Sequence, residues 1–422
     1  MTEFLMTTWD GAGATPPLMS VARALVARGH AVRVLADPVL ADEVRAAGAE
    51  HVSWTRAPHR RERSLASLFV RDFDVDPAEG FARLRDRVTV GPAAEFAADV
   101  REELRRRPAA AVLSELLIFG PLVAAEAAGV PAVVLNPTIN VVPAPGVPPF
   151  GFGLMPARDE AERAEHEQLA AGMVAAWDAA LPALNRARAQ EGLAPLEHVL
   201  DQGRSAARVL VMTSSAFDFP APLPPNVRYV GPRLDDPSWT NPWQAPAGDD
   251  PLVLVALSSD YQAQDDLLRR IVAALGGLPV RAVVTTGHGI DPQSLSPAPN
   301  VQLLRTAPHR QILRHAALTV THCGHGTTLK SLAAGVPLLC LPMGRDQYDI
   351  AARVVHAGAG VRLTDAAPPE QIARAVMQLL AAPQHRAAAQ RIAAAIAEET
   401  AEDLAAAEIE AVAAPQPAPA GV

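Results

Sequence analysis

The sequence predicts an α/β protein of two domains, each built on a parallel sheet with crossover helices. Short apolar runs of strand length alternate with segments of helical periodicity along most of the chain, which is the pattern of consecutive βαβ units. The 422 residues are long for one domain and suit two. A 49 % hydrophobic content with 20 % charged residues supports large buried cores and argues against a disordered chain.

Charge and cysteine content narrow the class of protein. A net charge of −9 argues against nonspecific nucleic-acid binding, because a phosphate backbone needs a basic face. Cys323 and Cys340 are the only cysteines, which indicates a reducing compartment without a disulfide framework or a zinc site. The start of the chain lacks the pattern of a secretory leader, and no apolar run is long enough to span a bilayer. We therefore expect a soluble cytoplasmic protein.

The segment from Thr321 to Gln347 carries the clearest chemical signal. The apolar run 316–320 predicts a buried strand, and a helical pattern begins at Thr327 and ends before Gly335. Between them, Gly324 and Gly326 allow a tight turn and a close approach of a ligand to the backbone. The free N–H groups at the start of a helix favour a negative charge, so the segment predicts a phosphate site.

Four side chains in this segment add donors for phosphate oxygens, namely His322, His325, Thr327 and Thr328. The alternative is a plain strand-to-helix connection in which the threonines cap the helix. A second apolar run at 337–342 predicts another strand, and it is followed by Asp346 and Gln347. An acid and an amide then lie at a carboxyl strand end, where open α/β sheets bind ligands.

At this point the chain resembles a known family. The sequence His-Cys-Gly-His-Gly-Thr at 322–327, Ala-Gly-Val-Pro at 334–337 and Gly-Arg-Asp-Gln at 344–347 is similar to the donor signature of the UDP-glycosyltransferase superfamily, in its bacterial macrolide and antibiotic branch. The resemblance implies the GT-B fold, which is two Rossmann-like doubly wound domains facing a central cleft. It also implies inverting, metal-independent transfer of a sugar from a UDP- or dTDP-sugar to a small apolar acceptor such as a polyketide, macrolide or phenol.

The same resemblance implies the partners and the domain limits. The nucleotide sugar is a co-substrate, no further cofactor or metal is needed, and the protein is a monomer or a homodimer. We expect an acceptor-binding domain at 1–233, a linker rich in Pro and Trp at 234–251 and a donor-binding domain at 252–385. A C-terminal helix at 386–412 is expected to cross back to the first domain, followed by a flexible tail at 413–422.

The first domain departs from the family pattern at its general base. A strand at 4–8, a turn at 10–17 and a helix at 18–28 form the first βα unit, and the superfamily places a catalytic histidine in this turn where the chain has Ala14. Transfer to a hydroxyl benefits from a proton acceptor. Two acids are candidate catalytic replacements: Asp10 in the same turn, and Glu115 at the end of the predicted strand 111–115. The alternatives are structural roles for both acids, with an acidic acceptor that loses its proton unaided.

Further along, the segment from Asn136 to Pro156 contains too many prolines and glycines for regular structure, and long loops of this kind are usually functional. Its apolar residues Phe150, Phe152 and Met155 predict a lining for the acceptor pocket. Segments with helical or strand patterns make up the rest of the first domain: helices at 93–106, 122–128 and 158–190, and strands at 32–36, 132–135, 209–213 and 227–232.

In the second domain, the strand 252–257 ends at Ser258, which the resemblance places beside the diphosphate. The turn after the strand 301–304 holds the nucleobase in the family, and here it contains Arg305, Ala307 and His309. Lys330 occupies a position where many members carry a glutamate for the ribose hydroxyls, so the ribose contact is in doubt and UDP and dTDP both remain open. The remaining segments predict helices at 267–275, 350–357 and 369–380, and strands at 280–285 and 360–363.

Two other functions stay open from the sequence. Because the usual histidine is absent, the chain could be a catalytically silent NDP-sugar-binding helper or regulator. An epimerase of UDP-N-acetyl sugars shares the GT-B fold, although the proline-rich loop and the Asp-Gln ending favour a transferase. The acceptor and the atom that receives the sugar, whether oxygen, nitrogen or carbon, are not determined.

Overall fold

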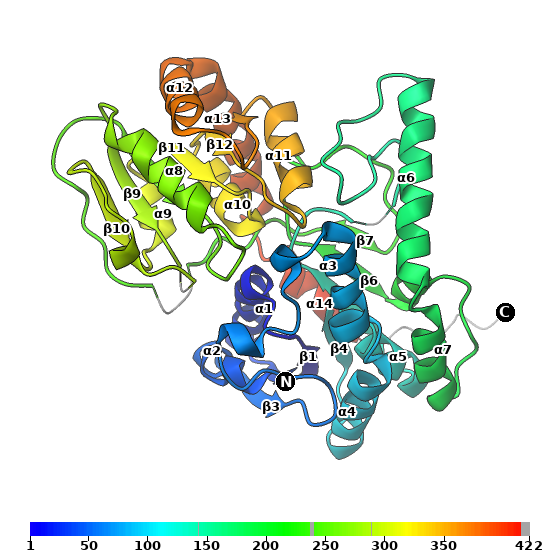
Figure 1. Ribbon diagram of the computed structural model, residues 1–422. Coiled ribbons are helices and arrows are strands. Elements are labelled where there is room, and N and C mark those ends of the chain that lie inside the picture. Colours follow the sequence, from blue (N-terminus) through cyan, green and yellow to red (C-terminus); the bar gives the residue numbers. More distant parts are fainter. Residues whose placement is uncertain (142, 237–239, 288, 415–422) are drawn as a thin grey trace.

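The computed structural model describes residues 1–141, 143–236, 240–287 and 289–414. Trp239 of the predicted linker and nearly all of the predicted tail at 413–422 lie outside these ranges. Two parallel sheets organise the described chain into two lobes (Figure 1). The first sheet has seven strands in the order β3-β2-β1-β4-β5-β6-β7, and the second has six in the order β10-β9-β8-β11-β12-β13.

The first lobe contains the following strands and helices: β1 (Glu3–Thr7), α1 (Thr15–Ala27), β2 (Ala31–Ala36), α2 (Ala41–Ala46), β3 (Glu50–Ser53), α3 (Pro77–Leu84), α4 (Ala93–Arg106), β4 (Ala111–Glu115), α5 (Gly120–Ala128), β5 (Ala132–Asn136), α6 (Glu160–Asp178), α7 (Leu181–Gln190), β6 (Arg208–Val211) and β7 (Val227–Tyr229). Short helical turns lie between them: η1 (Ala12–Ala14), η2 (Pro38–Leu40), η3 (Leu65–Ser67), η4 (Asp72–Asp74), η5 (Arg85–Thr89) and η6 (Val199–Ser205).

The second lobe contains β8 (Leu252–Ala256), α8 (Asp265–Gly276), β9 (Arg281–Thr285), η7 (Pro292–Ser294), β10 (Val301–Leu304), α9 (His309–Leu313), β11 (Ala316–Thr321), α10 (His325–Ala333), β12 (Leu338–Cys340), α11 (Gln347–His356), β13 (Gly360–Arg362) and α12 (Pro369–Ala381). Two more helices follow, α13 (Pro383–Glu399) and α14 (Leu404–Ala413). The predicted two-domain α/β fold is confirmed. The last strand of the first sheet ends at Tyr229 and the second sheet begins at Leu252, and the domain bounds inside that interval stay a prediction.

Each sheet reverses its strand order once, and the two reversals locate the site. In the first sheet the order changes direction between β1 and β4, whose carboxyl ends lead to Asp10 and Glu115. In the second sheet it changes between β8 and β11, whose carboxyl ends lead to Ser258 and His322. Open parallel sheets form a crevice at such a point because the connections leave on opposite faces. The topology therefore places four of the predicted site residues at two crevices.

Buried apolar side chains cover both faces of both sheets, as expected for strands that are hydrophobic along their whole length. In the first sheet, β4 and β5 are buried at every position. These rigid layers fix the strand ends from which the loops at the cavity depart.

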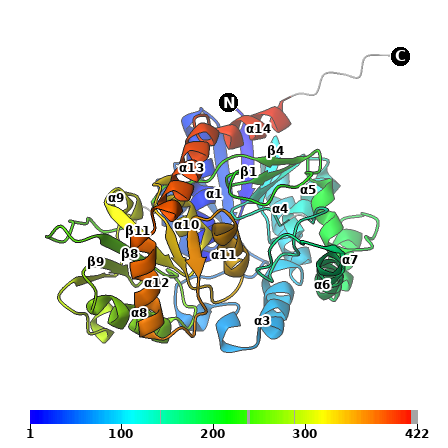
Figure 2. The same ribbon diagram turned by 90° about the horizontal axis from the view of Figure 1, so that it is seen from above.

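The chain end returns to the first lobe, as Figure 2 shows for α13 and α14. The sequence predicts one helix at 386–412, and the structure has two, because Asp403 caps α14 by accepting from the N–H of Ala406 at 3.0 Å. Arg233 of the first lobe forms an ion pair with the same carboxylate. Ala405, Ala406 and Ile409 are then buried in the core of the first lobe.

Two further differences have local causes. The predicted helix at 158–190 is split into α6 and α7, since Pro182 favours the first turn of a new helix over the middle of a long one. The short elements α2, β3 and α9 were not predicted from the sequence. No helix among the described residues combines the length and the apolar character needed to cross a membrane.

Candidate active site

A cavity of about 2170 Å³ lies between the two lobes. Its lining includes the loops that follow β1, β4 and β5 of the first sheet and those that follow β8 to β12 of the second. Helices α3 and α6 form its outer side, and α6 stands at the edge of the first lobe without a fully buried residue (Figure 1). All predicted site residues line this cavity except Met155 and the buried Thr328.

The N-terminus of α10 opens into the cavity. The first helical hydrogen bond is donated by Thr328 N to Gly324 O at 3.0 Å, so the N–H groups of His325, Gly326 and Thr327 have no partner within the helix. A Cβ atom on Gly326 would meet nothing within 4 Å, so packing does not require a glycine there. Cys323, just before the turn, has a φ of 68°, a left-handed backbone conformation that costs free energy for a residue other than glycine. The turn thus combines open donors, free space and strain, as expected for an anion site.

The two histidines beside this turn are neutral at pH 7. Burial, with a smaller contribution from Arg345, lowers the pKa of His322 to about 4 against the opposing effect of a hydrogen bond to the Ala256 backbone. Burial likewise lowers the pKa of His325 to about 4. Among the described residues, His322 Nδ1 and His325 Nε2 are buried without a hydrogen-bond partner. Such atoms cost free energy unless a ligand or water satisfies them, which makes both rings candidates for ligand contact.

The predicted nucleobase turn lies farther along the same edge. Arg305 is half exposed and lies 3.6 Å from Asp291 across an ion pair, while Ala307 is buried. His309 begins α9, and its Nε2 lies 3.1 Å from Thr285 Oγ1. Burial, with a smaller effect of Lys330, lowers the pKa of His309 to about 4.

Lys330 has an acidic partner that was not predicted from the sequence. Its Nζ lies 2.8 Å from Asp236 Oδ1, and Asp236 belongs to the segment that links the two sheets. The Asp236 carboxylate also accepts from the N–H of Arg310 at 3.1 Å. Lys330 cannot accept a hydrogen bond from a ribose hydroxyl, but the Asp236 carboxylate beside it can, and both residues line the cavity.

Ser258, Asp346 and Gln347 complete the donor side. Ser258 Oγ accepts from the N–H of Asp260 at 3.2 Å. Asp346 Oδ2 accepts from Thr138 Oγ1 of the first lobe at 2.7 Å, and burial raises the pKa of Asp346. The Gln347 amide accepts from Met343 N at 2.9 Å and donates to Gln262 at 2.9 Å. Most of the hydrogen-bonding capacity of the Gln347 amide is therefore used within the protein. Asp346 is more available than Gln347 for a sugar hydroxyl.

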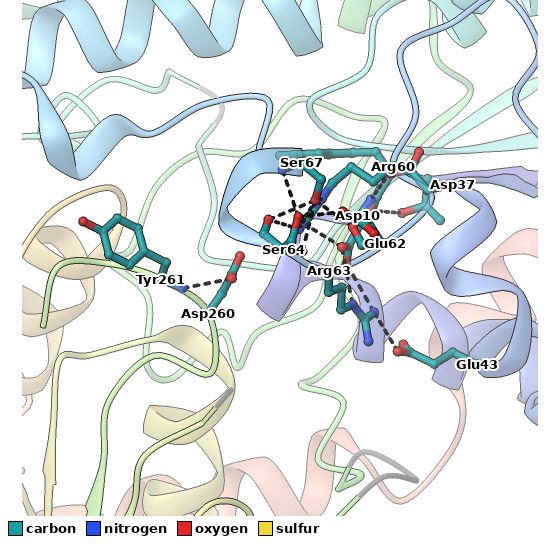
Figure 3. A network of polar contacts seen from close by, with 12 residues as sticks. Asp10, Asp37, Glu43, Arg60, Glu62, Arg63, Ser64, Ser67, Asp260 and Tyr261 are labelled. Atoms are coloured by element: carbon teal, nitrogen blue, oxygen red, sulfur yellow. Dashed lines mark hydrogen bonds and ion pairs between the residues drawn. The ribbon is translucent and has the colours of Figure 1, made fainter. Parts of the chain in front are cut away.

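Asp10 lies in a buried polar network on the first-lobe side (Figure 3). Arg60 Nη1 lies 2.7 Å from Asp10 Oδ2, and Arg63 Nη2 lies 3.3 Å from Asp10 Oδ1. The N–H of Asp10 donates to Asp37, whose pKa burial raises to about 7. With a guanidinium on each oxygen, both oxygens of Asp10 are engaged in ion pairs, which anchor the loop.

Glu115 has different surroundings. Its side chain is only 1 % exposed, and Oε2 accepts from Trp9 Nε1 at 3.3 Å and from Leu117 N at 2.8 Å. No cation pairs with it among the described residues, and burial raises its pKa to about 7. A carboxylate with this pKa at the cavity wall is suited to accept a proton near neutral pH. Of the two predicted acids, Glu115 has the geometry of a base.

The loop after β5 contributes part of the acceptor side. Asn136 is the last residue of β5, and the described residues 137–141 and 143–156 contain no helix or strand, as predicted. Phe150 and Phe152 line the cavity, the latter 41 % exposed. The prediction for Met155 is wrong, because its side chain is 40 % exposed and does not line the cavity. The cause is that Gly151 and Gly153 are held by Asp349 of the second lobe, which fixes the loop before it reaches Met155.

Comparison with known proteins agrees with this geometry. Residues 189–407, just over half of the chain, match the family described as UDP-glucoronosyl and UDP-glucosyl transferase. The chain belongs to this family. It is therefore a glycosyltransferase, and 4'-demethylrebeccamycin synthase of Lentzea aerocolonigenes is 29 % identical to it over 404 residues, covering 92 % of this chain and 94 % of the relative.

Solved structures share the fold of this glycosyltransferase. The glycotransferase of kitacinnamycin has a TM-score of 0.76 at 22 % identity, covering 97 % of this chain and 98 % of the other. Glycosyltransferase VinC in complex with DTDP has a TM-score of 0.69 at 20 % identity, covering 96 % and 100 %. The predicted GT-B fold and the predicted family are confirmed.

Several residues that line the cavity of this glycosyltransferase were not predicted from the sequence. Trp177 belongs to the predicted helix at 158–190, whereas Trp9 and Phe119 lie between predicted segments, and the sequence around them does not show which side chains face the cavity. Asp236 was assigned only to the linker. The proline-rich composition around it indicates a connection and gives no signal for a side chain that reaches Lys330.

Proposed function

We propose that this glycosyltransferase moves a sugar from a UDP- or dTDP-sugar to a small apolar natural-product acceptor, with inversion and without a metal ion. The observation that carries the proposal is the open N-terminus of α10, whose first three N–H groups have no partner within the helix and whose residues His325, Gly326 and Thr327 line the cavity. The names of the relatives support it, since one is a synthase of a rebeccamycin compound and one solved structure holds DTDP.

In the proposed complex the diphosphate lies on the N–H groups of His325, Gly326 and Thr327. Burial keeps the His322 ring neutral, so it would contribute a single N–H donor or acceptor while the helix N-terminus supplies the positive potential. Arg305, Ala307 and His309 would surround the base, and Asp236 would accept from the ribose hydroxyls in place of the usual glutamate. Asp346 would accept from a sugar hydroxyl.

The reaction then needs one proton acceptor on the opposite side. As the acceptor oxygen forms its bond to the anomeric carbon, its proton passes to Glu115 and the bond from that carbon to the diphosphate breaks. The electron pair of that bond leaves with the diphosphate. Because the donor and acceptor groups are on facing lobes, attack comes from the side away from the leaving group, which inverts the anomeric centre.

No metal takes part in this proposal, because the helix N-terminus already stabilises the charge that develops on the diphosphate. Among the described residues, no group of three or more His, Cys, Asp or Glu side chains is arranged to hold a metal ion. Activity should then survive in the presence of a chelator. A stimulation by divalent ions that EDTA abolishes would contradict it.

The diphosphate site is tested by Gly326→Asp. The new Cβ meets nothing within 4 Å, and an acid in the first turn favours the helix, so the fold should persist. The carboxylate would repel the diphosphate, and we expect UDP and dTDP affinity, measured by calorimetry, to fall at least about tenfold. Gly203→Asp is the control, since that position is equally open and lies outside the cavity. Unchanged nucleotide affinity in Gly326→Asp removes the assignment.

A further inference from the structure

Aromatic side chains are concentrated on the cavity. The chain has 10 Phe, 5 Trp and 3 Tyr, which is only 4 % of its residues. About half of them lie in the described part of the cavity lining: Trp9, Phe69, Phe73, Phe81, Phe119, Phe150, Phe152, Trp177 and Tyr261. A chain that uses few aromatic residues and places half of them on one surface indicates that rings are selected there for contact with a ligand.

Two of these rings already contact an arginine of the opposite lobe. Phe73 lies under the guanidinium of Arg345, with 5.2 Å between the cation and the ring centroid. The guanidinium of Arg71 likewise lies over the Tyr261 ring, 5.8 Å from its centroid. These two rings serve contacts between the lobes, so a ligand on the acceptor side would meet the remaining ones.

Three rings form a continuous wall on the first lobe. Phe81 of α3 and Trp177 of α6 pack edge to face, with centroids 4.9 Å apart and planes at 87°. Phe119, just before α5, lies 5.8 Å from Trp177. Since Phe81 and Trp177 are only partly buried, ring surface remains open to the cavity. We call this set the aromatic wall.

The aromatic wall leads to the proposed base. Glu115 precedes Phe119 by one short loop, which also brings Leu116 and Leu117 to the cavity. On the other side, the Trp9 indole donates to the Glu115 carboxylate and packs against Gly11, where an added Cβ would lie 3.1 Å from the ring. A ligand group that reaches Glu115 therefore lies between flat apolar surfaces.

Several cations near this part of the cavity are paired. Arg60 and Arg63 bind Asp10, and Arg63 also binds Glu43. Arg85 at the base of the wall binds Asp86 and the carbonyl oxygen of Ala176. These arginines are therefore engaged within the protein, and the contact surface that the aromatic wall offers to an acceptor is apolar.

Resting on the proposed function, we propose that the acceptor is a planar, polycyclic aromatic molecule with a weakly acidic O–H or N–H group. Its flat face stacks on the Trp177 indole, to which the Phe81 and Phe119 rings are inclined at 87° and 54°, and its O–H or N–H points to Glu115. That proton passes to Glu115 as the oxygen or nitrogen bonds to the anomeric carbon. A saturated macrocycle gains apolar burial at this surface but lacks the ring stacking, so it is the poorer ligand.

The test compares two acceptors and two variants. Alizarin, a planar hydroxyanthraquinone, and a 14-membered macrolactone aglycone are titrated into the protein with UDP present, and sugar transfer from UDP-glucose and dTDP-glucose is followed by mass spectrometry. We expect alizarin to bind at least tenfold more tightly than the macrolactone. Trp177→Leu should weaken alizarin binding about tenfold, and Trp177→Phe, which keeps a ring, should retain most of it.

Binding of UDP is the internal control and should not change in Trp177→Leu, while macrolactone binding should fall less than alizarin binding because only apolar contact area is lost. Equal affinity for the two acceptors, or equal loss with both variants, overturns the inference. Transfer to the macrolactone alone overturns it as well and leaves the proposed function standing. Alizarin binding that follows the ring at position 177 without any transfer supports the acceptor class and contradicts the proposed catalysis.

Discussion

Arg345 of the second lobe forms a two-point ion pair with Asp72 of the first, with Nε to Oδ2 at 2.7 Å and Nη2 to Oδ1 at 2.9 Å. Both residues line the cavity, and Arg345 has a φ of 55°. A left-handed backbone costs about 1 kcal/mol or more for a residue other than glycine, asparagine or aspartate. The ion pair therefore holds a strained residue whose next neighbour in the chain is Asp346.

This contact predicts a change in donor binding when it is removed. The side chains are 43 % and 20 % exposed, so the pair contributes at most about 1 kcal/mol. We expect Asp72→Ala to raise KM for the nucleotide sugar about threefold to fivefold, with kcat less affected. The exchange Asp72→Arg with Arg345→Asp should recover part of the loss. Asp266→Ala, which removes an exposed pair on α8, is the control. No change in KM would show that Arg345 does not position Asp346.

Glu115→Gln is predicted to abolish most turnover while the fold persists. The amide has the same shape but accepts no proton, and loss of a general base typically costs about 10² to 10⁴ in rate. Nucleotide affinity should stay unchanged. In the unaltered enzyme, kcat should rise with pH and level off above about pH 7, because burial raises the pKa of Glu115 to about 7. Asp10→Asn should lower the free energy of unfolding, while the kcat of the folded variant stays close to that of the unaltered enzyme. A large loss of kcat in Asp10→Asn with little loss in Glu115→Gln would assign the base to Asp10.

The same pKa predicts a pH-dependent stability difference. Between its usual pKa of 4.5 and about 7, Glu115 holds its proton in the folded state and loses it in the unfolded state. Unfolding then releases a proton, so this carboxyl group destabilises the fold increasingly as pH rises through that window. Glu115→Gln should gain stability relative to the unaltered protein from pH 5 to pH 8, by up to about 3 kcal/mol. Denaturant unfolding at both pH values measures the difference. A constant difference would show that the carboxyl pKa is not raised.

How much of the fold and site can be predicted from the sequence depends on how far apart the interacting residues lie. The strand, turn and helix around Gly326 follow from local periodicity, so the open helix N-terminus is predictable from the sequence alone. The guanidinium of Arg60 is fifty residues away from Asp10, and nothing in the local pattern of either residue shows that they meet. The same holds for Trp9 and Glu115, whose hydrogen bond brings the indole beside the buried carboxylate. The prediction for Met155 failed for a related reason, since Asp349 fixes the loop from the other lobe.

The last prediction concerns α14. Ile409 is fully buried in the core of the first lobe although it lies near the end of the described chain. Ile409→Ala removes apolar contact and leaves a cavity, which costs about 2 to 5 kcal/mol in unfolding free energy. Met377→Ala, at a side chain that is 39 % exposed on α12, should cost far less and serves as control. Because α14 is far from α10 in the sequence and packs on the other lobe, UDP affinity of the folded variant should be unchanged. If Ile409→Ala weakens UDP binding as much as it lowers stability, then the two lobes do not unfold separately and α14 couples them.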